Sequence, residues 1–310
     1  MQASLINWTL DAIDSGANGF MPPLDMRESI ANIRALPPLP GTAARIIDLI
    51  SDPEADVDKL TEIIEMDPML TAQVVRWASS ALYGYRGKVD SVRNAIIRVL
   101  GFNFVFDLAL GLAVLAPLKA PQEGVIGTRA FWMHALASTR LMKLLIERMP
   151  VELQPNRDEV FIAGLIHNIG FPLFGHQFPE EFAHLQSLIA INPAANIYNL
   201  ETFAFGVNHA QLGAWLMNTW GMPRVLTDIV YHHHNPYYRG DNYRLNLLIY
   251  LNDFLLGQIG IGDAAQQPFA DELWSELGLQ AVHGQQALGQ IQAEIALLKE
   301  MAESMANVAK

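Results

Sequence analysis

Apolar side chains recur every three or four residues along most of this chain, and this period constrains the fold more than any other feature. One such run begins behind Asp67-Pro68 and carries Leu70, Val74 and Trp77 on one face. That spacing places the apolar side chains on one stripe of an α-helix. The chain holds no run of alternating β-branched residues long enough for a strand. The sequence therefore predicts an all-α fold built from many short helices.

Start and stop signals divide this pattern into separate helices. An aspartate before a proline begins a helix at Pro68, and Ser91 can cap the next one. Gly84 and Gly101 are the expected ends of these two runs. The segment 102–115 is apolar nearly all round, which predicts burial between two layers of helices. The expected helices are 42–50, 57–66, 68–82, 92–100, 102–115, 130–149, 158–166, 180–191, 208–219, 224–232 and 244–256.

Prolines and glycines between residues 117 and 127 form the clearest internal break, and they separate two helical lobes. These residues are Pro117, Pro121, Gly124 and Gly127. We expect four parts along the chain. They are an N-terminal helical extension over 1–32, an N-terminal lobe over 33–120, a second lobe over 121–262 and an amphipathic helical tail over 263–310.

The tail carries an apolar stripe that needs a partner. The stripe consists of Leu288, Ile291, Ile295, Leu298, Met301 and Met305. Each buried side chain of this kind contributes roughly 1.5–3 kcal/mol, so the stripe is expected to be covered. Two arrangements would cover the stripe: docking on the body of the same chain, or a homodimer through the C-terminal helix. Docking within the chain is favoured, because the stripe is only about three heptads long.

Composition excludes several classes of function. The chain has no cysteine, which excludes disulfides, thiolate zinc sites and cysteine nucleophiles. It has 20 basic and 32 acidic residues, and its net charge of −12 disfavours binding to nucleic acid. Polar residues interrupt its longest apolar stretches, 102–118 and 245–261, so no membrane span is expected. Its beginning does not resemble a signal peptide, and we expect a cytoplasmic protein.

Histidines on several predicted helices are the strongest candidates for chemistry. They are His134, His167 followed by Asn168, His209, and His233 and His234 in a tandem that begins at His232. Asp253 lies within an apolar helix. Imidazoles and a carboxylate from several helices are what a first-row metal site requires. Spacing alone leaves open whether they converge, and the alternative is that each histidine is a core or capping residue.

The order of short motifs along the chain resembles the HDOD domain family, bacterial relatives of the HD-superfamily metal-dependent phosphohydrolases. The resemblance runs from about residue 33 to residue 257. Its motifs are Leu36-Pro37-Pro38-Leu39-Pro40, Asp67-Pro68, the segment 77–84, Ser91-Val92, Leu100-Gly101, Trp132-Met133-His134, the segment 163–170, Asn208-His209-Ala210, the segment 220–223 and the segment 231–236. The resemblance implies an HD-like multi-helix bundle with an additional N-terminal helical lobe, and a role in bacterial signalling.

The resemblance also implies a set of metal ligands. Carried over position by position, the family's ligand pattern falls on His134, His167, Asn168, His209, His233, His234 and Asp253. Two residues depart from the pattern of active enzymes. Asn168 stands where a carboxylate would bridge two ions, and an amide offers only one neutral oxygen. Phe171 stands where active cyclic-dinucleotide hydrolases usually carry a lysine facing phosphate, and their Gly-Tyr-Pro sequence is missing after His234.

These departures favour a non-catalytic signalling module over an enzyme. Such a module would bind a partner protein in trans or a small ligand, and it would hold at most one divalent transition metal: iron, manganese, nickel or zinc. The first alternative is a metal-dependent phosphohydrolase with an altered ligand set, acting on a phosphoester or a nucleotide. The second alternative is a structural helical scaffold whose histidines are satisfied core groups.

Overall fold

The structure is a computed structural model, and it describes residues 22–31, 33, 36–49, 52–263 and 269–308. Every regular element in these segments is helical, which confirms the all-α fold class. Most of the predicted N-terminal extension, residues 1–21, lies outside the described residues. Among the described helices, none is both long enough and apolar enough to cross a membrane.

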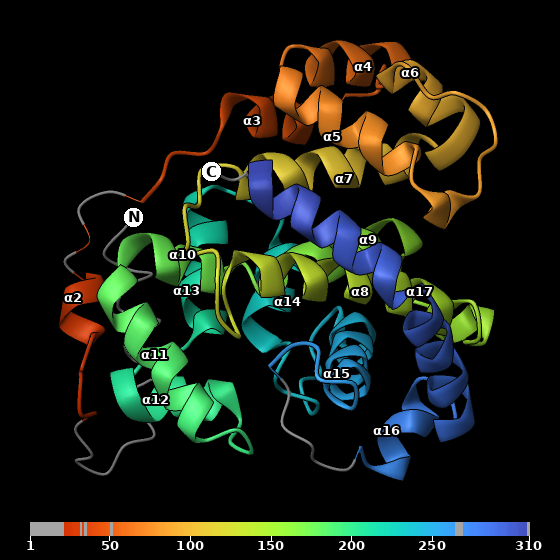
Figure 1. Cartoon of the computed structure of the whole chain (residues 1–310). Helices are drawn as coiled ribbons and strands as arrows, with labels where there is room; N and C mark the ends of the chain where they lie inside the picture. Colours follow the sequence, from red (N-terminus) through yellow and green to blue (C-terminus); the bar gives the residue numbers. More distant parts are fainter. Residues whose placement is uncertain (1–21, 32, 34–35, 50–51, 264–268, 309–310) are drawn as a thin grey trace.

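The N-terminal lobe is a group of short helices that lie together at one end of the molecule (Figure 1). Its helices are α3 (Gly41–Asp48), α4 (Val57–Glu65), α5 (Pro68–Ala78), α6 (Val92–Ala95) and α7 (Phe102–Leu115), with a π-helical turn at Ile96–Leu100. The Asp67 carboxylate caps α5 by accepting from the backbone N–H groups of Met69 and Leu70. The Ser91 hydroxyl caps α6 by accepting from the backbone N–H of Asn94. Both sequence-based caps are therefore present.

Helix α5 ends earlier than the sequence predicts. It stops at Ala78, and a separate 3₁₀ turn at Ala81–Tyr83 precedes Gly84. The Ser79 hydroxyl donates to the carbonyl of Val75 at the break. Serine side chains compete in this way for backbone partners, which is the local reason why the helix does not continue to Gly84.

Helix α7 is the layer that joins the two lobes. It packs against α3 and α5 on one side and against α9 (Arg157–Ile166) on the other. Leu110, near its middle, is 2% exposed. All residues from Asp107 to Leu115 are buried, whereas Asn103 in the first turn is exposed. Burial of this apolar helix between two layers is what the sequence predicts.

The second lobe is built around α8 (Thr128–Ile146), which packs against α9 and α15 (Tyr243–Gly257). The other helices of this lobe are α10 (Gly170–Gln177), α11 (Pro179–Ile191), α12 (Ile197–Phe205), α13 (His209–Thr219) and α14 (Arg224–His232). Helix α13 lies against both α10 and α14. Helices α10 and α12 were not expected from the sequence. Within α10, Gly170, Pro172 and Gly175 hide the periodic signal, because glycine and proline normally break helices.

The described N-terminal segment lies against the second lobe. The backbone N–H groups of Leu24 and Met26 donate to the carbonyls of Ala204 and Phe205, at the end of α12. The short helix α2 (Arg27–Ala31) follows at the same side of the molecule (Figure 1), and Arg27 lies close to Gly206 at the end of α12.

The C-terminal tail docks within the chain. It consists of α16 (Asp271–Glu276) and the long α17 (Ala281–Val308), which lies along α8 and reaches α5 (Figure 1). Its stripe is buried except at Ile295, which is half-buried. The guanidinium of Arg140 on α8 donates two hydrogen bonds, of 2.8 and 2.7 Å, to the carboxylate of Glu294. Because the stripe is already covered, a homodimer would have to use the outer face of α17, and it stays a prediction.

Candidate functional site

The predicted site residues gather inside the second lobe as two adjoining groups. The first group, here the motif set, is His134, His167, Asn168 and Asp253. The second group, here the triplet set, is His209, His233 and His234. Within each group, nitrogen or carboxylate oxygen atoms of three side chains lie within 4.8 Å of one another: those of His134, His167 and Asp253, and those of the three triplet histidines. The structure thus brings together side chains that are up to 119 residues apart in the sequence.

The motif set joins three helices. His134 lies on α8, His167 and Asn168 follow the end of α9, and Asp253 lies on α15. The Nε2 atom of His134 lies 3.0 Å from Oδ1 of Asp253, and its Nδ1 atom lies 3.3 Å from the amide nitrogen of Asn168. A carboxylate accepts and an amide nitrogen donates, so neutral His134 carries its proton on Nε2. His134 is therefore fully hydrogen-bonded within this set.

His167 is held less completely. Its Nδ1–H donates to the carbonyl of Ala163 at 3.1 Å, while its Nε2 lies 3.4 Å from Oδ1 of Asp253. Burial lowers the pKa of His167, but the Asp253 carboxylate outweighs burial and the net shift is upward. In turn, burial would raise the pKa of Asp253, but His167 and His134 hold it well below its usual range. The imidazole of His167 and the carboxylate of Asp253 thus favour each other's charged forms.

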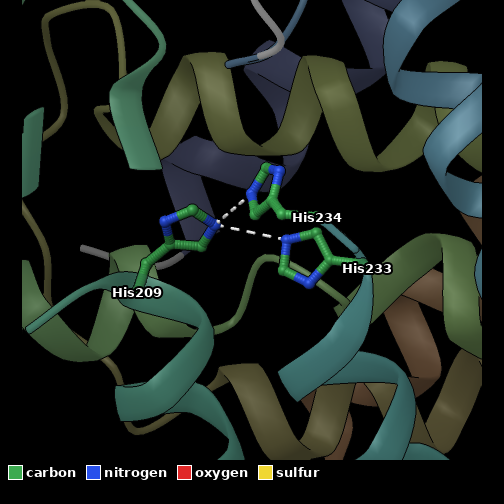
Figure 2. A group of neighbouring side chains, drawn as sticks. All are labelled: His209, His233 and His234. Carbon is green, nitrogen blue, oxygen red and sulfur yellow. Dashed lines mark hydrogen bonds between the residues drawn. The ribbon is translucent and has the colours of Figure 1, made fainter. Parts of the chain in front are cut away.

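The triplet set brings three imidazoles together (Figure 2). His209 is the first residue of α13, and His233 and His234 follow the end of α14. The Nε2 atom of His209 lies 3.2 Å from Nε2 of His233 and 3.0 Å from Nε2 of His234. His209 and His233 are completely buried. The placement of His209 depends on a capping box in which the Asn208 side chain starts α13 beside the site.

Two carboxylates that the sequence analysis did not select complete this region. Oε2 of Glu201 on α12 accepts from the Nδ1–H of His209 at 2.6 Å. Oδ2 of Asp263 lies 3.2 Å from Nε2 of His234 and 3.4 Å from Nε2 of His209. Both carboxylates are buried. Asp263 also lies beyond residue 262, so the predicted boundary between second lobe and tail cuts through the site.

A glycine turn after α15 positions Asp263. Gly262 has a φ of +94°, a conformation that side-chain-bearing residues rarely adopt. A Cβ on Gly262 would lie 2.8 Å from the ring of His134. Glycine therefore allows the backbone to pass close to His134 in the motif set. The next residue, Asp263, then reaches the triplet set. The run Gly260-Ile261-Gly262 is the only local signal in the sequence for this turn, and it does not indicate where Asp263 lies.

Burial and charge set opposite pKa shifts on the triplet histidines. Burial lowers the pKa of His233 well below its ordinary value, and the neighbouring His234 adds to this effect. Burial also acts to lower the pKa of His209, but the Glu201 carboxylate outweighs it and raises the pKa. Burial acts to raise the pKa of Asp263, but His234 and His209 hold it below its usual range.

Phe171 closes the site on one side. Its ring stacks on the imidazole of His209, with 4.0 Å between ring centroids and 19° between planes. The adjoining cavity, lined by Asn168, Phe171 and Asp263 among others, measures about 20 Å³. That volume holds about one water molecule, whereas sites for small organic ligands measure roughly 300–1,000 Å³. Cavities of about 520 and 240 Å³ elsewhere are lined by residues outside both sets.

The residues present fit a bound divalent cation. Several buried polar atoms here have no hydrogen-bond partner among the described residues: Nε2 of His167, Oδ2 of Asp253, and both side-chain oxygens of Asp263. Imidazole and carboxylate donors suit iron, nickel, zinc and manganese. A bound cation would neutralise these donors and hold their helices together.

The fold and site define an all-helical protein of two lobes with a buried histidine–carboxylate centre. The model of the HDOD domain family matches residues 36–236, which is more than half of the chain. The chain belongs to the HDOD family, and the resemblance in its sequence motifs is confirmed. Asp253 and Asp263 both lie beyond the matched region.

Solved structures share this fold. A candidate signal transduction protein from Marinobacter aquaeolei VT8 is 31% identical and has a TM-score of 0.79, and the match covers 100% of this chain and 66% of that one. An HDOD domain protein of unknown function from Geobacter sulfurreducens is 21% identical with a TM-score of 0.74, covering 90% of this chain and 96% of that one. A candidate metal-dependent phosphohydrolase from Shewanella amazonensis SB2B is 19% identical with a TM-score of 0.56, covering 100% and 99%.

A curated relative comes from Treponema pallidum (strain Nichols), where it is an uncharacterized protein. The two chains are 25% identical over 219 residues, which is 70% of this chain and 41% of the relative. The chain thus spans less than half the length of this relative, and 66% of the Marinobacter protein.

Proposed function

We propose that this chain is a regulatory HDOD module of bacterial signalling that binds one divalent transition-metal ion and does not turn over phosphoesters. The observation that carries the proposal is the closure of the histidine site by Phe171. Donors suited to a cation converge there, but the adjoining cavity of about 20 Å³ does not accommodate a phosphoester. The ion would serve to hold the second lobe together.

Two features of the site support the absence of hydrolysis. Asn168 uses its amide to donate to His134 and supplies no charge with which to bridge two ions. Phe171 places an uncharged ring where a phosphoryl oxygen would need a positive group. Both electrostatic contributions to phosphoester cleavage are therefore weakened.

A signalling role is supported by the Marinobacter protein, which is described as a candidate signal transduction protein. We propose that the module acts on a separate protein in trans. We also propose that its second lobe extends through Asp263, because this residue contacts the histidines of that lobe.

The test is metal content together with turnover by the purified full chain. We expect about one transition-metal ion per chain. With manganese or iron added, we expect hydrolysis of bis(p-nitrophenyl) phosphate and of cyclic dinucleotides far below about 1 per second. The variant Asn168→Asp/Phe171→Lys restores both missing charges and is the matched comparison. Turnover near 1 per second by the unmutated chain would establish the phosphohydrolase alternative, and absence of any metal uptake would establish the scaffold alternative.

A further inference from the structure

Four donor atoms from three segments of the chain approach one another where Asp263 meets the triplet set. They are the Nε2 atoms of His209, His233 and His234 and Oδ2 of Asp263. The close pairs among these atoms are separated by 3.0, 3.2, 3.2 and 3.4 Å. Such short separations are favourable only if a proton or a cation lies between the atoms of each pair.

In His209 and His233, the hydrogen bond that Nδ1 makes determines whether the neutral ring has a proton on Nε2. The Nδ1–H of His233 donates to the carbonyl of Val230 at 2.8 Å, and the Nδ1–H of His209 donates to Glu201. A carbonyl and a carboxylate only accept, so both Nδ1 atoms are protonated. In their neutral forms, His209 and His233 therefore point two Nε2 lone pairs at each other across 3.2 Å.

With three neutral imidazoles and an ionised Asp263, protons do not satisfy all four atoms. The lone pair of His209 then faces that of His233 at 3.2 Å and the Asp263 carboxylate at 3.4 Å. Only additional protons on these side chains would relieve both contacts, whereas a cation among the four atoms attracts all of them in their ordinary charge states.

The donor spacing also fits one transition-metal ion. Ligands at about 2.0–2.1 Å from a metal lie about 3.3 Å apart in a tetrahedral site, and slightly closer at higher coordination numbers. The hydrogen bond from His209 to Glu201 adds the carboxylate that orients a metal-bound imidazole and raises its basicity. Three imidazoles and one carboxylate favour zinc, iron or nickel over magnesium or calcium.

The motif set, by contrast, already contains several hydrogen bonds between its members. His134 donates to Asp253 and accepts from Asn168, and Asn252 donates to Asp253 at 3.0 Å. Its atoms without a hydrogen-bond partner among the described residues are Nε2 of His167, Oδ1 of Asn168 and Oδ2 of Asp253. An ion in the motif set would therefore have to displace the hydrogen bonds that His134 makes with Asp253 and Asn168.

We propose that the metal ion occupies the triplet set and that Asp263 is its carboxylate ligand, replacing the charge that Asn168 does not provide. This inference rests on the proposed function, because it assigns the donors of the ion proposed there. Since Asp263 lies six residues beyond the end of α15 at Gly257, ion binding also links this residue to α13 and to the end of α14.

The experiment titrates the metal-free full chain and its variants with cobalt(II) and records the visible absorption of the bound ion. The unmutated chain is expected to bind one cobalt ion with intense bands of low coordination number. Asp263→Asn is expected to weaken binding at least tenfold and to shift the bands. Asp253→Asn, the matched change in the motif set, is expected to stay within about twofold, and the exposed Asp271→Asn is expected to have no effect. Circular dichroism before metal addition establishes that each variant is helical.

A second measurement needs no variant. In the proton spectrum of the cobalt-loaded chain, ligation by the triplet set gives three exchangeable imidazole N–H signals shifted by the ion, and ligation by the motif set gives two. Loss of binding in Asp253→Asn but not in Asp263→Asn, or two shifted signals, would overturn this inference alone. Failure of the unmutated chain to take up cobalt would overturn the proposed function as well.

Discussion

The two donor sets lie side by side and contain similar residues, yet their hydrogen bonding differs. The rings of His167 in the motif set and His233 in the triplet set have centroids 5.3 Å apart. In the motif set, a carboxylate and an amide supply matching donors and acceptors for His134. In the triplet set, three imidazole nitrogens and one carboxylate oxygen face one another. Closeness of potential ligands is therefore a weaker criterion for an ion site than unsatisfied lone pairs.

The comparison also shows that the position of a motif in the sequence does not determine its chemistry. The HD-type motif ends in Asn168, whose amide donates to His134 and does not offer an ion a second carboxylate. The anionic charge near the triplet set comes instead from Asp263, 95 residues later by residue number. A carboxylate lost from one segment can be supplied by another when the fold brings both to the same place.

The largest expected effect concerns the ring that closes the triplet set. Phe171→Ala should destabilise the fold by about 3–5 kcal/mol, because it removes a buried aromatic side chain that is 4% exposed and leaves a cavity. Urea unfolding measures this loss. The matched control is Phe203→Ala, whose side chain is 57% exposed and should change stability by less than about 0.5 kcal/mol. Equal effects at the two positions would show that Phe171 does not seal the site.

The second-largest effect on stability is expected from removal of the ion, and it should distinguish the triplet set from the motif set. At a free metal concentration about 1,000 times the dissociation constant, the ion stabilises the folded chain by about 4 kcal/mol. Thermal unfolding with zinc and with a chelator measures the difference. His209→Asn should abolish it, and His134→Asn should leave it nearly intact. A metal-dependent stabilisation that His134→Asn abolishes instead would reverse the comparison.

The carboxylate behind His209 should have a smaller effect. Glu201→Gln keeps the size of the side chain but removes the charge that orients His209, and it should weaken zinc binding by about 10- to 100-fold. Isothermal titration calorimetry measures the affinity. Glu180→Gln, on the first turn of α11 and exposed, is the control and should not change it. An unchanged affinity in Glu201→Gln would mean that His209 is not a ligand.

The smallest effect is expected from a substitution that makes the motif set more similar to the triplet set. Asn168→Asp gives the motif set a second carboxylate, so a second manganese or iron ion should bind at least tenfold more tightly than in the unmutated chain. Elemental analysis after equilibrium dialysis should find the metal content rising from about one toward two ions per chain. A stoichiometry that stays at one would show that the motif set does not become an ion site.

Sequence periodicity predicted most of the helices but only part of the site. The bounds of α14 and α7 match the expected segments 224–232 and 102–115, because long apolar patterns and clear caps act locally. Glu201 was missed because it lies on α12, which was not expected, and an isolated glutamate on a helix usually faces solvent. Asp263 was missed because it follows a glycine turn in a loop. Only tertiary packing determines that this loop reaches His209 and His234.

The most direct test of the comparison is to locate the ion itself. Crystals of the zinc-loaded chain, measured on both sides of the zinc absorption edge, give an anomalous difference map that shows only the metal. We predict one strong peak among the Nε2 atoms of His209, His233 and His234, within about 2.2 Å of an oxygen of Asp263. A peak between His134, His167 and Asp253, with Asp263 outside coordination distance, would contradict the assignment.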